Sequence, residues 1–200
     1  YNMKVLDGEP VKVINEDGTV TFTIKIQSGK VFSDGSAITA KHYIASILAN
    51  STAVSKAAGA TGNAGLQIEG FAAFAKSANG KDADGKKVYF SGVKLIDDNT
   101  FALTYSADYA NYYYAYYYAS LSPLYLPMYA SAELTVKDDG EGAYLDGGEL
   151  VADEINASRY VYADRVSAGP YMVKSLDTGS LTATLEINPN YAGNFEGQKP

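Results

Sequence analysis

The segment VTFTIKIQ at residues 20–27 constrains the fold most, because its apolar and polar residues alternate strictly. Its apolar positions are Val20, Phe22, Ile24 and Ile26. Successive side chains of a strand point to opposite faces, so this period of two predicts a strand that is buried on one face only. The turn-forming sequence EDGT precedes it and makes residues 11–14 the expected partner strand.

A helix is predicted next along the chain. Thr39 is a favourable N-cap residue, and apolar side chains then recur at helical spacing on one face. These side chains are Tyr43, Ile47 and, beside them, Ile44 and Leu48. We expect this helix to end near Asn50.

Further strands follow without a regular pattern of alternation with helices. Residues 88–106 predict two strands joined at residues 97–99, and residues 169–191 predict a β-hairpin that turns at residues 177–180. The acidic, glycine-rich residues 137–148 predict a loop. Together these elements predict an α+β fold with mixed, largely antiparallel strands and several helices.

Charge and composition exclude several classes of partner. The formal net charge is −7, which argues against a nucleic acid or an anionic lipid surface as the partner. The chain has no cysteine, which excludes disulfides, zinc–thiolate sites and a cysteine nucleophile. No apolar run of about 18 residues occurs, so we expect no direct membrane insertion by this segment.

The residues that commonly carry catalysis or bind metals form no recognisable motif. His42 is the one histidine, and we interpret it as a helix residue rather than a catalytic base, because no GxSxG motif accompanies it. Residues 81–86 resemble the start of a calcium loop, but Ser91 stands where the bidentate glutamate belongs. The carboxylates of residues 138–142 are interpreted as solvated. We therefore predict no catalytic residue, no metal and no cofactor.

Six tyrosines lie within the seven residues 112–118, interrupted only by Ala115. On a helix, residues four apart share a face, so the tyrosines would cover about two-thirds of the circumference. One contact surface cannot take all six. Two interpretations remain: packing combined with surface cover, or an exposed subset that lines a cleft with large, rigid side chains. A membrane belt is the weakest option, because no spanning segment adjoins it.

Four blocks of the sequence, in this order, resemble the bacterial extracellular solute-binding proteins of family 5. VTFTIKIQSGKVFSDGSAITAKHYIASI at residues 20–47 is similar to the family signature. SGVKLIDDNTFALTY at 91–105 and YYYASLSPLYLP at 116–127 resemble the next two blocks. The SAGPYMVKSLDTG…NPNYAGNFEGQKP block at 167–200 resembles the fourth. The resemblance covers most of the chain.

This resemblance implies a fold and a division into domains. The family's proteins have two lobes that close over a ligand, a periplasmic-binding-protein-like fold of class C. The chain is expected to be a fragment of the first lobe. Residues 1–165 would form its extra α+β subdomain, and residues 166–200 a β-hairpin that leads back into the main sheet of that lobe. The second lobe would be absent.

The resemblance also implies a function. The family comprises the oligopeptide-, dipeptide- and nickel-binding components of ABC importers. We expect a non-enzymatic protein that binds peptides or similar small solutes and delivers them to a membrane permease. Its expected location is extracytoplasmic, either periplasmic or lipid-anchored on the outer face of the cytoplasmic membrane.

The resemblance assigns ligand-lining positions as well. The loop before the LSP motif approaches the family's ligand cleft, and the matching residues here are Tyr118 and its neighbour Tyr117. On the first helix, the position where an aromatic side chain can face the ligand is Ala45 in this chain. The chain departs from the family pattern at Ala37, His42 and Ala192, where proline, an acidic residue and tryptophan are usual.

Two other classes of function compete with this one. A surface interaction protein would use the tyrosine-rich patch to contact another protein or a glycan. An enzyme would use clustered carboxylates, but no nucleophile–base pair is evident in the motifs.

Overall fold

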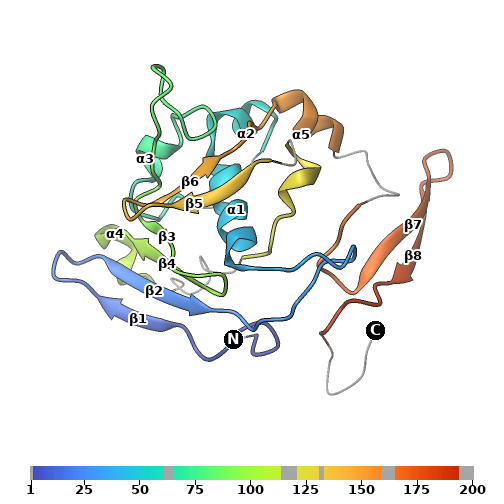
Figure 1. Ribbon diagram of the computed structural model, residues 1–200, viewed down its shortest axis with the longest axis horizontal. Helices are drawn as coiled ribbons and strands as arrows, with labels where there is room; N and C mark the ends of the chain where they lie inside the picture. The colour runs from blue at the N-terminus through green and yellow to red at the C-terminus, as the bar shows by residue number, and fades with distance from the viewer. Residues whose placement is uncertain (1, 61–64, 114–120, 131–132, 159–164, 194–200) are drawn as a thin grey trace.

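The computed structural model describes residues 2–60, 65–113, 121–130, 133–158 and 165–193. Its central element is a four-stranded antiparallel sheet with the strand order β1-β2-β4-β3 (Figure 1). The strands are β1 (Val11–Ile14), β2 (Val20–Lys25), β3 (Val93–Leu95) and β4 (Thr100–Tyr105). The predicted partner of residues 20–27 and the predicted pair within residues 88–106 are thus confirmed.

The alternation in β2 separates a core face from an outer face. Val20, Phe22 and Ile24 are buried, whereas the intervening Thr21 and Thr23 are half-buried. On the outer face, the hydroxyls of Thr21 and Thr104 lie 2.9 Å apart in a cross-strand hydrogen bond. One face therefore provides apolar packing and the other provides polar cross-strand contacts.

Helix α1 (Ala40–Ser51) packs between this sheet and a second, two-stranded sheet (Figure 1). Its buried face includes the predicted Tyr43, Ile44, Ile47 and Leu48, and the helix ends one residue beyond Asn50. Short elements surround it. These are α2 (Ala53–Ala57), α3 (Phe71–Phe74), α4 (Ala107–Ala110), the 3-10 helix η2 (Leu126–Met128) and α5 (Ala152–Ser158). Within the described ranges, no helix is long and apolar enough to span a membrane.

The second sheet corrects one expectation. Residues 137–148 do not form a loop, because β5 (Thr135–Asp138) and β6 (Ala143–Asp146) pair antiparallel there. Val136 and Leu145 are buried among the core residues beside α1. The Asp138 carboxylate accepts a hydrogen bond from the Leu95 backbone N–H at 2.9 Å. Packing and this bond give structure to a segment whose composition favours a loop.

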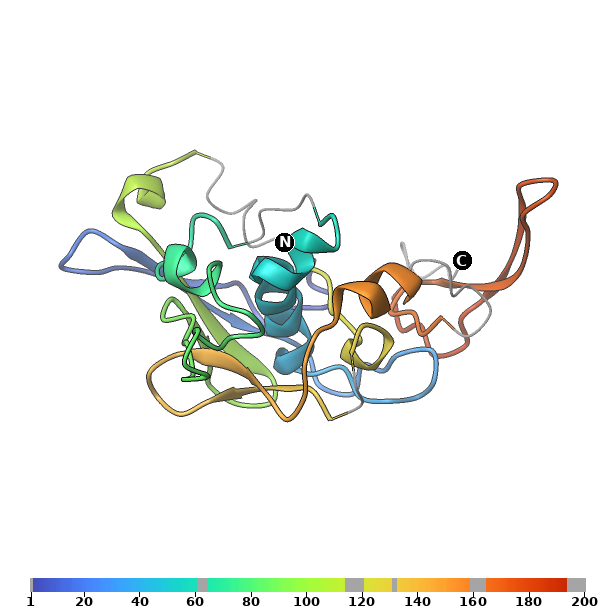
Figure 2. The same cartoon turned by 90° about the horizontal axis from the view of Figure 1, so that it is seen from above.

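The hairpin predicted within residues 169–191 is confirmed as β7 (Tyr171–Asp177) and β8 (Thr182–Ile187). It extends away from the body, as Figures 1 and 2 both show. Its base is tied to the FSDGS turn of residues 32–36 through Ser33. The Ser33 N–H donates to the Ser167 carbonyl at 2.8 Å, and the Asn190 side-chain amide donates to the Ser33 carbonyl at 3.0 Å.

His42 takes the place of the usual acidic residue in the first turn of α1. Its Nδ1 accepts a hydrogen bond from the Thr39 backbone N–H at 3.0 Å, which caps the helix start. Burial lowers the pKa of His42 below its ordinary value of 6.5. The Thr39 backbone and Asp34 oppose this shift, and Lys41 adds to it. Protonation of Nδ1 would turn this acceptor into a donor and break the cap.

We expect the capping role of His42 to make stability depend on pH. The unfolded chain gains its histidine proton near pH 6.5, before the folded chain does, so the free energy of unfolding falls as the pH drops through that range and levels off below the folded pKa. Urea unfolding at pH steps from 8 to 5 measures this. The control is His42→Gln, which keeps an acceptor at this position but does not titrate. Equal pH profiles for the two proteins would contradict the role assigned to His42.

Candidate functional site

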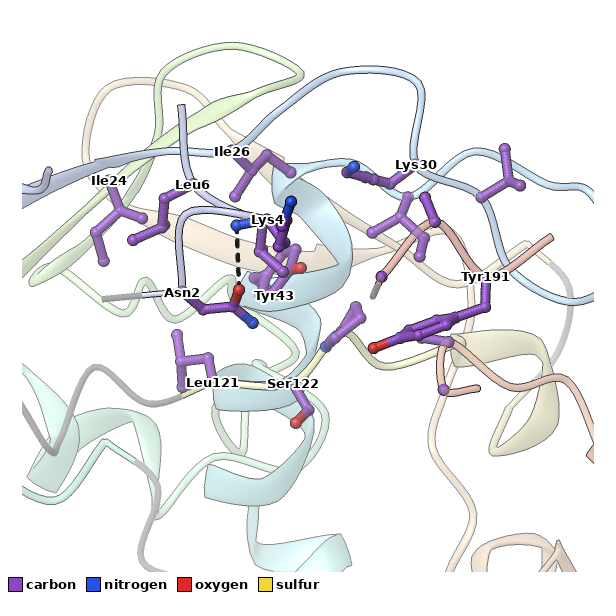
Figure 3. A pocket seen from close by; sticks show the side chains of 18 of the residues that line it. Asn2, Lys4, Leu6, Ile24, Ile26, Lys30, Tyr43, Leu121, Ser122 and Tyr191 are labelled. Atoms are coloured by element: carbon purple, nitrogen blue, oxygen red, sulfur yellow. Dashed lines mark hydrogen bonds between the residues drawn. The ribbon is translucent and has the colours of Figure 1, made fainter. Parts of the chain in front are cut away.

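A groove of about 930 Å³ lies where several segments of the chain meet. They are the N-terminal segment, strands β2 and β4, the segment at residues 30–38, the start of α1, residues 121–123 and the base of the β7–β8 hairpin. Figure 3 shows Ile24 and Ile26 on one side, Leu121 and Ser122 opposite them, and Tyr191 on a third side. The volume lies within the range typical of small-molecule sites.

The floor of the groove is apolar and rigid. Ile24, Ile26 and Phe101 are buried core residues that also line the groove. The rings of Tyr43 and Phe101 stack with their centroids 6.0 Å apart and their planes at 13°. Burial raises the pKa of Tyr43, so its phenol stays neutral at physiological pH. Side chains held by core packing present a preformed surface, which lowers the entropy cost of binding.

The rim of the groove carries hydrogen-bond donors and positive charge. Lys4 and Lys30 line it, and within the described part of the chain neither forms an ion pair. Near them, the Asn2 Oδ1 accepts a hydrogen bond from the Lys4 backbone N–H at 3.1 Å (Figure 3). An apolar floor under cationic and amide groups suits a ligand that combines apolar side chains with carbonyl or carboxylate oxygens.

The structure places the predicted site residues in different ways. Tyr117 and Tyr118 lie outside the described residues, although the described segment resumes at Leu121 and lines the groove from there to Pro123. Ala45 lies in α1 with 1% of its surface exposed. It follows Tyr43 by two positions, so the two side chains point about 200° apart on the helix. The contact between Ala45 and a ligand stays a prediction.

The sequence interpretation did not select Tyr43, Lys30 or Tyr191 as site residues. Tyr43 was assigned to the helix core face, which it does share. Tyr191 belongs to the NPNY motif, and the resemblance of that block to the family was the available signal for it. No signal of this kind marks Lys30, because its place on the rim depends on the turn that follows β2.

Comparison with known proteins gives the family of the chain. Residues 11–200 match the family described as "Bacterial extracellular solute-binding proteins, family 5 Middle". The chain belongs to this family. No curated protein matches the sequence. The match covers all four blocks of the sequence that resemble family 5, so that resemblance is confirmed.

Solved structures support the fold. The chain is similar to Listeria monocytogenes OppA bound to peptide, with 20% identity and a TM-score of 0.57, over 93% of this chain and 30% of that one. It is similar to Haemophilus influenzae OppA in complex with RPPGFSPFR, with 17% identity and a TM-score of 0.55, over 94% and 33%. The chain thus spans about a third of the length of these two-lobed proteins. The prediction of an α+β fold with largely antiparallel strands is confirmed, and so is the prediction that the chain forms part of a two-lobed fold.

The described ranges contain no recognisable metal-binding site. No group of three or more histidine, cysteine, aspartate or glutamate side chains is arranged there to hold a metal ion. The groove itself is lined by apolar, amide, hydroxyl and lysine groups. Such groups can hold a small ligand through apolar contacts and hydrogen bonds.

Proposed function

We propose that this chain is part of the substrate-binding component of an ABC importer, and that it binds peptides or similar small solutes outside the cytoplasmic membrane. Residues 1–165 would be the extra α+β subdomain of the first lobe, and residues 166–200 would lead back into the main sheet of that lobe. The complete protein would deliver its ligand to a membrane permease without catalysis. Its location would be periplasmic or lipid-anchored.

The observation that carries this proposal is the groove, together with membership of family 5. A peptide presents apolar side chains along a backbone of carbonyl oxygens. The buried floor of Ile24, Ile26 and Phe101 would contact the apolar side chains, and the amide and ammonium groups of the rim would donate hydrogen bonds to the carbonyl oxygens. Closure of a second lobe over this open groove would exclude water from both kinds of contact.

Tyr191 is the groove residue best suited to a test, because it is half-buried and its aromatic side chain lines one side of the groove (Figure 3). In the complete two-lobed protein, we expect Tyr191→Ala to weaken the affinity for short peptides about tenfold, the loss typical of an aromatic anchor. Isothermal titration with a library of short peptides measures the effect. The matched control is Tyr113→Ala, which removes a tyrosine with 86% of its surface exposed and outside the groove.

The same pair of variants separates peptide transport from the second candidate function. Tyr112 and Tyr113 are 50% and 86% exposed, and this exposure favours a surface patch for a glycan or another protein. Retention on a glycan array that is lost in Tyr113→Ala and kept in Tyr191→Ala would support the patch. Unchanged peptide affinity in Tyr191→Ala, or no saturable binding of any peptide, would contradict the proposal of a peptide site in the groove.

A further inference from the structure

A second cleft, of about 420 Å³, lies beside the groove. It opens between the region of η2 and the start of β7. Ser122, Pro123, Ala168 and Gly169 line both the groove and this cleft, so these four residues form the wall between them. The walls of the cleft are largely apolar and aromatic, with Phe32, Met128 and Met172 among them.

Arg165 is the charged residue of this cleft. Its Nη2 donates to the Tyr129 hydroxyl at 3.1 Å, and its Nη1 donates to the Ser158 carbonyl at 3.5 Å. A guanidinium has five N–H donors in a planar fork, so the two bonds to described residues leave further donors for another acceptor. Within the described ranges, no carboxylate lies within 4.0 Å of it, because all six ion pairs there use lysine.

Among the residues that the structure describes, the half-buried Arg165 has neutral partners only, although the chain carries a formal net charge of −7. A cation that has lost part of its hydration gains most from a charged acceptor. A carboxylate matches the guanidinium fork with two parallel hydrogen bonds, a geometry that the compact lysine ammonium does not offer.

The two hydrogen bonds also orient the guanidinium. Tyr129 follows η2 directly, and Ser158 is the last residue of α5, so two separate elements hold the arginine. A positioned donor fork loses less side-chain entropy on binding than a free one. The cleft thus combines an oriented cation with apolar walls, and these two features together select an anion that has an apolar part.

We propose that this cleft is a second ligand site, which binds an organic carboxylate attached to an apolar group. Arg165 is the anchor for the carboxylate, and Phe32, Met128 and Met172 receive the apolar group. The same chemistry occurs in a free aromatic or aliphatic acid and in the C-terminal residue of a peptide. The site is distinct from the groove and does not depend on the function proposed for it.

The methionines allow a direct test on the 200-residue chain. It has three methionines, of which Met128 and Met172 line the cleft and Met3 lines neither the cleft nor the groove. We expect titration of methyl-¹³C-methionine protein with 3-phenylpropionate to shift the Met128 and Met172 signals saturably and to leave the Met3 signal in place. The amide of the same acid, which lacks the charge, should bind at least tenfold more weakly.

A second arm distinguishes the source of the carboxylate. N-acetylphenylalanine and its amide present the same chemistry as the end of a peptide. Tighter binding of N-acetylphenylalanine than of 3-phenylpropionate assigns the site to peptide C-termini, and the reverse order assigns it to free acids. Either order supports the proposal, provided that the corresponding amide binds at least tenfold more weakly.

Variants test the anchor itself. Arg165→Gln should weaken carboxylate binding at least tenfold, and Arg165→Lys should weaken it less, because the charge remains while the fork is lost. Tyr191→Ala, which alters the groove alone, should leave the titration unchanged, and it therefore separates failure of this site from failure of the groove. Circular dichroism checks that each variant is folded.

Three results would overturn the proposal. They are equal binding of acid and amide, no saturable shift of Met128 and Met172, and an unchanged affinity in folded Arg165→Lys and Arg165→Gln.

Discussion

Replacement of Phe90 by alanine should lower the free energy of unfolding by about 3–5 kcal/mol, the loss typical of a large aromatic residue removed from a close-packed core. Phe90 is completely buried, with 0% of its surface exposed. Its ring stacks on Phe74 with the centroids 5.0 Å apart. Its backbone N–H donates to the Ala143 carbonyl at 2.9 Å, so Phe90 joins the two strand layers of the body.

Urea unfolding followed by far-ultraviolet circular dichroism measures this loss. Ile96→Ala is the matched control, because Ile96 is 56% exposed and its truncation should cost less than about 0.5 kcal/mol. If Phe90→Ala costs no more than the control, the packing of α3 and β6 around this ring is wrong.

Gly142→Ala should be similarly damaging, for a reason that concerns the backbone. Gly142 has a φ of +145°, and a Cβ added there would lie 2.8 Å from the Phe90 carbonyl oxygen and 2.9 Å from the Ser91 Cα. These are backbone atoms, so the backbone at residues 90 and 91 must move to admit the methyl group. We expect a cost of about 1–3 kcal/mol from the backbone conformation and about 1–3 kcal/mol more from the overlap.

Gly140 separates the two contributions. Its φ is +102°, which also disfavours alanine, but nothing lies within 4 Å of the added Cβ. Gly140→Ala should therefore show only the conformational cost, and the difference between the two variants measures the close approach of the β5–β6 turn to residues 90 and 91. Identical unfolding midpoints for the two variants would contradict that approach.

The spacing of apolar residues within a single segment was sufficient to predict strand β2 and helix α1. The alternation of residues 20–27 fixed the strand and its buried face, and the spacing from Tyr43 to Leu48 fixed the core face of α1. The β5–β6 pair was missed because its sequence is rich in Asp and Gly. Its apolar residues are Val136, Ala143 and Leu145, which the adjacent Asp and Gly residues obscure. Its pairing is stabilised by packing on α1, which local propensity does not describe.

The candidate site was harder to predict, because it is formed by contacts between distant segments. Ile24, Tyr43, Leu121 and Tyr191 meet in one groove although they are up to 167 positions apart in the numbering. The family resemblance assigned the ligand contact to Tyr117 and Tyr118, which lie outside the described residues, so that assignment stays a prediction. Arg165 belongs to no recognised sequence motif. Only the structure shows that no carboxylate of the described residues pairs with it.

The attachment at Ser33 has a mechanical consequence. The serine lies in the turn that leads into α1, and the hairpin base is bonded to its carbonyl oxygen, its backbone N–H and its hydroxyl. Three hydrogen bonds thus link the turn to the hairpin base. Any tilt of the hairpin would therefore displace Tyr191 and the residues before Thr39 together, and would change the width of the groove and the entry to the helix at the same time.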